Sequence, residues 1–332
     1  MKRILTFCLC ISLILAGLVG CQNKKAEEVE PKQPLFSELN TSYGEHNLSF
    51  AVEDSVLTVS GKINESAYQY LIVILNDEND PSNVVKVKND AFSTTVSLPE
   101  DEEEIVVDLY GGQDEYGSFE SIMLDFVKLE KTKDGWALIE SPVYEHNQSV
   151  FSVEKDKSQA LNATEQIQSD DEEIKLLAES ITAGISDDYQ KAKEIHDWVA
   201  TNIYYDYDAL QSGQYGNMDA KNVLATKKGV CEGFANLMAA MLRSQNVPCR
   251  IQNGYALGVG TDREWNGTNT NSTESNHAWN EVFLDGRWII IDATWDTKNK
   301  YQNGTFTQGN SIVETYFDAT LEFFSLSHKL LD

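Results

Sequence analysis

The chain has 332 residues, and its 53 acidic side chains outnumber its 26 basic ones, for a formal net charge of −27. It shows no basic patch suited to nucleic acid, and neither a P-loop nor a dinucleotide-binding fingerprint, so we expect no nucleic-acid partner. It also shows no Cys and His cluster with zinc-type spacing, so we expect no catalytic metal and no other cofactor.

The first residues predict export and a lipid anchor. Lys2 and Arg3 precede an apolar run, Ile4–Val19, that is too short to span a bilayer comfortably. The run leads into Leu18–Cys21, which resembles a bacterial lipoprotein processing box. We therefore expect residues 1–20 to be a signal peptide and Cys21 to carry lipid, holding the protein on the bacterial membrane outside the cytoplasm. An ordinary secretory signal or an uncleaved anchor is the alternative.

The next part of the chain predicts a tether and then a β-domain. Residues 21–45 are rich in Lys, Glu, Pro and Gln and lack periodicity, which is typical of a flexible tether. Residues 46–130 contain short β-rich runs separated by turn signals, so we expect a small immunoglobulin-like β-sandwich. The expected strands are Val56–Ile63, Tyr70–Leu75, Val84–Lys88, Ala91–Leu98, Ile105–Tyr110 and Ile122–Leu129.

A connector of mixed character, residues 131–168, leads to a second domain at 169–332. Ser169–Glu172 matches a capping box that opens a helix. A second helix is expected over about Asp187–Ile203, and its lone His196 is interpreted as structural or exposed. The whole chain is thus expected to be of α+β class.

Cys231 begins the segment with the strongest chemical signal. Apolar residues recur after it at helical spacing to about Arg243, so the thiol belongs to the first turn of a helix. The unpaired N–H groups and positive dipole of that turn favour a thiolate. Gly229 and Gly233 leave room for another backbone or a substrate. Because free cysteines are among the most buried residues, a core thiol is the alternative.

A hairpin downstream supplies two partners for this thiol. His277–Leu284 alternates in polarity, Asp285-Gly286 is a two-residue turn signal, and Arg287–Asp292 follows. That register sets Asp292 opposite Trp279 and His277 opposite Thr294, so His277 and Asp292 become diagonal neighbours about 7–8 Å apart at the backbone. The carboxylate would fix the imidazole's tautomer, leaving the other ring nitrogen to take the thiol proton. We predict a catalytic set of Cys231, His277 and Asp292, although each of the last two alone reads as a polar residue at a strand end.

Three segments, Gly229–Ala235, His277–Val282 and Trp288–Trp295, resemble the signature blocks of the transglutaminase-like superfamily. The resemblance covers about a third of the chain. It implies a papain-related α+β fold, with the Cys at a helix N-terminus packed on an antiparallel sheet that carries His and Asp, and acyl transfer through a thioester. It also implies that an aromatic residue after the second helix approaches the site, which makes Tyr205 a candidate oxyanion donor or else an ordinary core tyrosine. The N–H of Cys231 is the other candidate donor.

The remaining thiol, Cys249, is expected to be buried at the start of a strand and unbridged to Cys231. The polar stretch between Gly258 and Asn276 is expected to be a loop that borders the cleft, with Trp265 as its anchor. Together these features predict a membrane-anchored thiol enzyme acting on amide bonds of peptides or proteins, cell-wall peptides included. The alternative is a non-catalytic surface lipoprotein that binds a ligand or acts as a scaffold.

Overall fold

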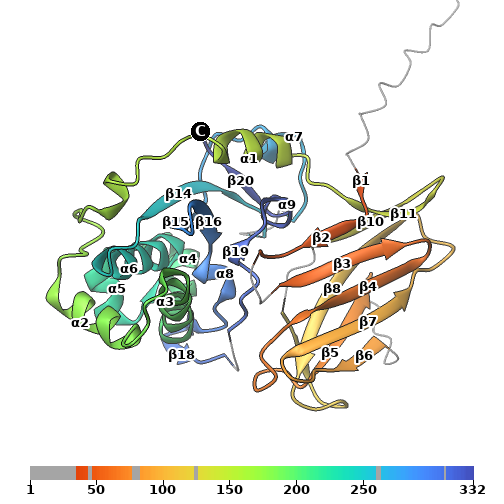
Figure 1. Ribbon diagram of the computed structural model, residues 1–332, viewed down its shortest axis with the longest axis horizontal. Helices are drawn as coiled ribbons and strands as arrows, with labels where there is room; N and C mark the ends of the chain where they lie inside the picture. The colour runs from red at the N-terminus through yellow and green to blue at the C-terminus, as the bar shows by residue number, and fades with distance from the viewer. Residues whose placement is uncertain (1–34, 44–46, 77–82, 123–125, 259–262, 310–311) are drawn as a thin grey trace, which may run out of the picture. The chain divides into compact units, whose positions relative to one another are not determined.

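The computed structural model describes residues 35–43, 47–76, 83–122, 126–258, 263–309 and 312–332, which fold into β-sheets and a group of helices (Figure 1). The expected signal peptide, Cys21 and the first part of the expected tether lie outside the described residues. Among the residues described, no helix has both the length and the apolar character needed to cross a bilayer. Residues 33–332 form one compact unit.

Two antiparallel sheets build the N-terminal part of this unit. One has the order β2-β3-β4-β7, with bounds Glu38–Asn40, Leu48–Glu53, Val56–Lys62 and Ala91–Ser97. The other has the order β1-β11-β10-β8-β5-β6, with β9 paired to β8. Its bounds in that order are Leu35–Phe36, Gly135–Ile139, Val127–Thr132, Glu104–Gly112, Tyr70–Leu75 and Val84–Lys86, with β9 at Phe119–Ser121. Buried residues of both sheets, such as Phe50 and Leu109, share one hydrophobic core.

The strand-forming region is longer at both ends than the sequence predicted. The tether prediction was wrong for residues 35–40, because β1 pairs with β11 and β2 pairs with β3. The limit at residue 130 was also wrong, because β11 lies in the expected connector and buries Trp136 in the core. Strands of two to five residues are too short to show alternation, so their pairing depends on neighbours distant in sequence. An immunoglobulin-like arrangement stays a prediction.

Helices follow over the rest of the chain. They are α1 Tyr144–Phe151, the 3₁₀ turn η2 Gln159–Leu161, α2 Glu172–Ile181, α3 Asp188–Asn202, α4 Tyr207–Ser212, α5 Ala220–Thr226 and α6 Cys231–Ser244. The capping-box prediction was wrong by two residues, since the Asp171 carboxylate caps α2 by accepting from the N–H groups of Glu173 and Ile174. Buried apolar residues of α2, α3, α5 and α6 form one core, and these helices lie together beside β14, β15 and β16 (Figure 1).

A five-stranded antiparallel sheet packs against α6. Its order is β19-β16-β15-β14-β20, with bounds Phe317–Ala319, Arg287–Ile291, His277–Leu284, Cys249–Ala256 and His328–Leu330. The register of the predicted hairpin is confirmed from Leu284↔Arg287 to Asn280↔Ile291. Positive φ angles at Asp285 and Gly286 suit the two-residue turn.

The prediction that Asp292 continues this ladder was wrong. Strand β16 ends at Ile291, and Asp292 becomes the N-cap of a short helix, α8 (Ala293–Asp296). Its side-chain oxygen accepts from the N–H groups of Thr294 and Trp295. Asp292 therefore faces no residue across a ladder, and its carboxylate is oriented by a helix cap instead.

Three smaller elements complete the surroundings of the site. A sheet of order β13-β12-β17-β18 has bounds Lys228–Gly229, Tyr204–Asp206, Lys300–Gln302 and Thr305–Thr307, and β12 runs parallel to both of its neighbours. The stretch expected to be a polar loop contains the short helix α7, Gly267–Thr270, capped by Asn266. Trp265 anchors this stretch, because its ring N–H donates to the Leu326 carbonyl at 2.8 Å. Helix α9 spans Leu321–Phe324.

Candidate active site

Cys231 is the first residue of α6, where the sequence placed it. The N-cap residue, Val230, makes no side-chain cap, and its carbonyl accepts from the N–H groups of Gly233 and Phe234 at 2.8 Å and 3.2 Å. The interpretation of Gly233 needs correction, since a Cβ there would lie 2.8 Å from a methyl group of Val223 and 3.1 Å from the Met218 sulfur. The space beside Gly233 is therefore filled by side chains of α5 and of the segment before it, and not by a substrate.

The Cys231 thiol and the His277 imidazole line one cavity of about 550 Å³. The thiol is half-buried and the imidazole almost fully buried. The two side chains lie close enough for the Cys231 sulfur to contribute to the raised pKa of His277. The cavity wall also includes Tyr205, Asn236 and Glu232. For convenience we call it the thiol cavity.

Asp292 lies on the other side of the imidazole. The Nε2–H of His277 donates to Asp292 Oδ2 at 2.6 Å, and both groups are buried. Burial by itself would lower the pKa of His277, but the Asp292 carboxylate and the Cys231 sulfur outweigh burial and raise it to about 10. Burial would raise the pKa of Asp292, yet His277 and then His328 hold that pKa far below its usual range. The pair is therefore charged at neutral pH.

The sequence did not point to His328, which lies on β20 and is fully buried. Its Nε2 lies 3.5 Å from Asp292 Oδ2, its Nδ1 lies 2.8 Å from Ser327 Oγ, and its ring stacks on Phe324 at 4.0 Å between centroids. Burial lowers the pKa of His328 to about 4, so this imidazole is neutral at neutral pH. It belongs to no motif, and only the β14–β20 pairing brings it to Asp292.

Within the described parts of the chain, one group of metal-ligand type comes together: the ligand atoms of His277, Asp292 and His328 lie within 4.8 Å of one another. The sequence predicted that His277 and Asp292 lie together, but it did not show that His328 joins them, because His328 belongs to no motif. The 2.6 Å separation of His277 and Asp292 is that of a charge-assisted hydrogen bond, which accounts for the closeness of these two groups.

Asn280 is a second residue whose role the sequence did not suggest. Its buried side-chain amide donates to the Ala235 carbonyl of α6 at 3.0 Å and approaches the Cys249 sulfur at 3.4 Å. This contact ties β15, which carries His277, to the helix that begins with Cys231. Cys249 itself begins β14, is fully buried and unbridged, and burial raises its pKa to about 12, so the predictions for this thiol are confirmed.

Tyr205 comes near the thiol because β12 pairs with β13. The pairing sets Tyr205 beside Gly229, two residues before Cys231, and the ring lines the thiol cavity. Burial raises the pKa of this phenol, and the nearby Cys231 adds to that effect, so the hydroxyl keeps its proton. A role for Tyr205 as an oxyanion donor stays a prediction.

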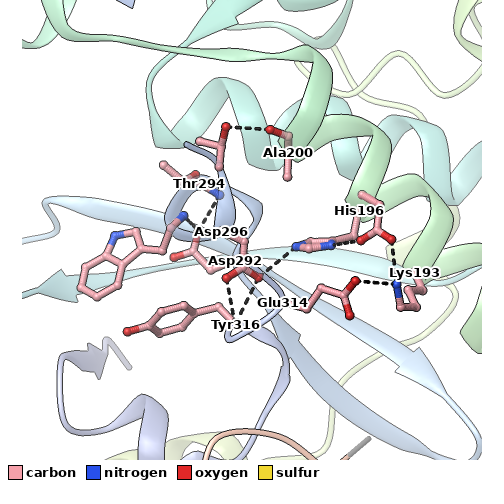
Figure 2. Close-up of polar contacts among 11 residues, drawn as sticks. Lys193, His196, Ala200, Asp292, Thr294, Asp296, Glu314 and Tyr316 are labelled. Carbon is pink, nitrogen blue, oxygen red and sulfur yellow. Dashed lines mark hydrogen bonds and ion pairs between the residues drawn. The ribbon is translucent and has the colours of Figure 1, made fainter. Parts of the chain in front are cut away.

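A second His–Asp pair lies at the other end of α8 (Figure 2). His196 is fully buried, and its two ring nitrogens contact Asp197 Oδ1 at 2.8 Å and Asp296 Oδ2 at 3.0 Å. Lys193 extends the network, since its ammonium donates to Asp197 and Glu314. Asp296 also accepts from the Tyr316 backbone N–H at 3.1 Å. His196 is thus part of a buried polar network and is not exposed.

Comparisons with known proteins agree with this geometry. Residues 175–293 match the family model of the transglutaminase-like superfamily. This segment is a transglutaminase-like domain. The match confirms the resemblance that the signature blocks predicted, and it contains Cys231, His277 and Asp292.

The chain is also similar to individual proteins. It is 34% identical over 150 residues to mouse kyphoscoliosis peptidase, covering 43% of this chain and 20% of that protein. It is 26% identical over 137 residues to the YebA protein of Bacillus subtilis, covering 40% of this chain and 18% of that protein. The matched segment thus spans about a fifth of these relatives. The periplasmic domain of TgpA from Pseudomonas aeruginosa is 12% identical, with a TM-score of 0.31 over 79% of this chain and 94% of that one.

Proposed function

We propose that this chain is a thiol enzyme of transglutaminase-like type that acts on amide bonds of peptides or proteins through a thioester on Cys231. One observation carries the proposal: His277 lines the same cavity as the Cys231 thiol and contacts the Asp292 carboxylate at 2.6 Å. That arrangement supplies a nucleophile, a proton carrier and a group that stabilises the charged imidazole.

The first half of the reaction makes the thioester. His277 holds the proton as an imidazolium, and the Cys231 sulfur attacks the amide carbonyl carbon as a thiolate, so that a C–S bond forms and the carbonyl oxygen becomes negative. The first N–H groups of α6 point to where this charge develops, and the Tyr205 hydroxyl is a second donor. His277 then gives its proton to the amide nitrogen, the C–N bond breaks, and an amine leaves.

The second half resolves the thioester. Water or an amine attacks the thioester carbonyl and passes a proton to His277. The C–S bond then breaks, the thiolate leaves beside the imidazolium that holds this proton, and the product is an acid or a new amide. Asp292 stabilises the imidazolium in both halves without becoming protonated itself.

A paired cysteine experiment tests this proposal. An electrophilic peptide or glutamine probe is expected to label the wild-type chain at Cys231 and to label Cys249→Ala equally, because Cys249 is buried. Cys231→Ala is expected to lose labelling and acyl transfer, with its circular dichroism spectrum unchanged. Peptide mapping identifies the labelled residue. Acyl transfer that persists in Cys231→Ala would rule the mechanism out.

We also propose that lipid on Cys21 holds the enzyme on a bacterial membrane, facing outside the cytoplasm. The support is the apolar run followed by Leu18–Cys21. Metabolic labelling with a fatty-acid analogue is expected to mark the wild-type chain and Cys10→Ser but not Cys21→Ser, which should leave the detergent phase. Equal labelling of the two variants would contradict the anchor at Cys21.

A further inference from the structure

A second cavity, of about 490 Å³, adjoins the thiol cavity. Both cavities are lined by Tyr205, Leu210 and His277, so the aromatic ring and the imidazole stand where the two meet. The second cavity does not include Cys231 in its wall. Its other walls come from α4, α8 and the segment after α8, with Tyr207, Trp295 and Tyr316 as aromatic surfaces.

The charge of this second cavity is opposite to that of the chain. Besides His277, its charged lining residues are Arg263, Lys298 and Lys300, and its described lining contains no carboxylate. The chain as a whole has about two acidic side chains for each basic one. In the adjoining thiol cavity the charged lining side chain, other than Cys231 and His277, is an acidic one, Glu232. A cavity whose described charged lining residues are all cationic, in so acidic a chain, favours an anionic ligand.

Lys298 is the best-placed cation in this cavity. Its ammonium donates to the Ser121 carbonyl at 3.1 Å, and among the described residues this is the one acceptor it has, whereas an ammonium carries three donors. Burial lowers the pKa of Lys298, and the field of Asp296 and Glu120 acts against that effect. A bound carboxylate would both accept from the remaining donors and offset the cost of burying the charge.

Reaction geometry then decides which part of a substrate enters this cavity. The acyl carbon must sit on Cys231, and the leaving or attacking amine must exchange a proton with His277. A cavity that contacts His277 without Cys231 therefore suits the amine side of the bond. We propose that Lys298, with Lys300 and Arg263, binds a carboxylate on the amine side of the amide bond, in the leaving amine and in the acceptor amine alike. This inference rests on the thioester mechanism proposed above.

The test follows resolution of an acyl-enzyme, because this step isolates the amine side. p-Nitrophenyl acetate acetylates the thiol, and the dipeptides Gly-Gly and Gly-Gly-amide serve as acceptors, whose amines are of similar basicity. The acceptor nitrogen forms a C–N bond to the acetyl carbon as the C–S bond breaks, and its proton returns to the thiolate through His277. We expect Gly-Gly to resolve the acetyl-enzyme roughly tenfold faster than its amide, the value of one charge-assisted hydrogen bond.

Matched variants assign this preference to the cavity. Lys298→Gln and Lys300→Gln are expected to reduce the preference, Lys298→Arg to restore most of it, and Lys133→Gln to keep it, since Lys133 is an exposed lysine beside Asp134 that loses the same charge outside the cavity. A further pair, Gly-Glu-amide against Gly-Gln-amide, asks whether a side-chain carboxylate replaces a terminal one. A preference in either pair that depends on Lys298 or Lys300 supports the proposal.

Two negative results have different meanings. If no acetyl-enzyme forms on Cys231, with Cys231→Ala as the blank, the thioester mechanism and this inference both fail. If the acetyl-enzyme forms but both members of each pair resolve it equally, or the lysine variants keep the full preference, the mechanism stands and the carboxylate site is overturned.

Discussion

Two buried His–Asp pairs lie at opposite ends of the four-residue helix α8. His277 pairs with Asp292 at the N-cap, and His196 pairs with Asp296 at the last residue, at 2.6 Å and 3.0 Å. The carboxylates raise the pKa of each histidine to about 10 against the opposing effect of burial. Residue type and burial are therefore nearly the same in the two pairs, although the pKa of Asp292 lies below its usual range while burial raises that of Asp296 to about 6.

The pairs differ in what the second ring nitrogen faces. In His196 that nitrogen contacts Asp197 at 2.8 Å, so both ring nitrogens are bound to carboxylates. This ring therefore has no nitrogen left to exchange a proton with a substrate. In His277 it is left for the Cys231 thiol, and the ring lines two cavities. A thiol and access to a cavity, rather than a His–Asp pair, distinguish the candidate active site from a structural network.

The largest expected effect is a difference in the rate of acyl-enzyme formation between variants of the two aspartates. Asp292→Asn should slow acyl-enzyme formation by roughly 10³–10⁴-fold, because the amide no longer stabilises the imidazolium or selects its tautomer. Asp296→Asn should reduce the rate per folded molecule far less. Single-turnover labelling with the electrophilic probe measures both variants. Similar losses in the two would show that the pairs are not functionally distinct.

The next largest effect is on stability, and here we expect the His196–Asp296 pair to matter more than the His277–Asp292 pair. His196→Gln should lower the free energy of unfolding by about 3–5 kcal/mol, because it leaves the buried Asp296 and the half-buried Asp197 without their shared cation. The raised pKa of His196 means that this contribution is complete below about pH 6.5 and is lost as pH rises toward 10. Urea unfolding of the wild type and the variant at pH 6 and pH 9.5 should show their difference shrinking at the higher pH. A constant difference would contradict the charged pair.

A pH profile sharpens the comparison further. Since Asp292 and Cys231 raise the pKa of His277 to about 10, acyl transfer should persist on the alkaline side until pH approaches 10 and then fall as the imidazolium loses its proton. Asp292→Asn should move this limb to lower pH by about 1–3 units, because removing an opposite charge lowers the pKa of the histidine. Rates across pH 6–11 measure the shift. His196→Gln should leave the limb in place.

The smallest expected effect concerns His328, which acts through Asp292 and is a positioning residue. His328→Gln should slow acylation by roughly tenfold, since the carboxylate loses one of the groups that orient it. The same variant should shift the alkaline limb slightly, which a purely structural role in stacking on Phe324 would not do. Phe324→Leu is the matched control, since it loosens the stack while keeping the imidazole.

Several features of the site were predictable from sequence because they depend on local spacing. The apolar periodicity after Cys231 predicts α6, and the two-residue turn at Asp285-Gly286 predicts the hairpin register. Two other features could not be predicted from the sequence, for different reasons. Asp292 leaves the strand because its side chain caps α8, a choice that alternation cannot reveal. His328 and His196 belong to no motif and reach the aspartates through contacts between segments distant in the sequence.

By itself, the sequence predicted the candidate nucleophile, its helix, the hairpin partners and the family of residues 175–293, because helix and hairpin periods constrain side chains a few residues apart. Only the tertiary structure showed that carboxylates contact both ring nitrogens of His196 and that His328 lies beside Asp292. It also gathered three cations around a cavity in an acidic chain. The physical reason is that burial and charge depend on neighbours far along the chain, which no local pattern records.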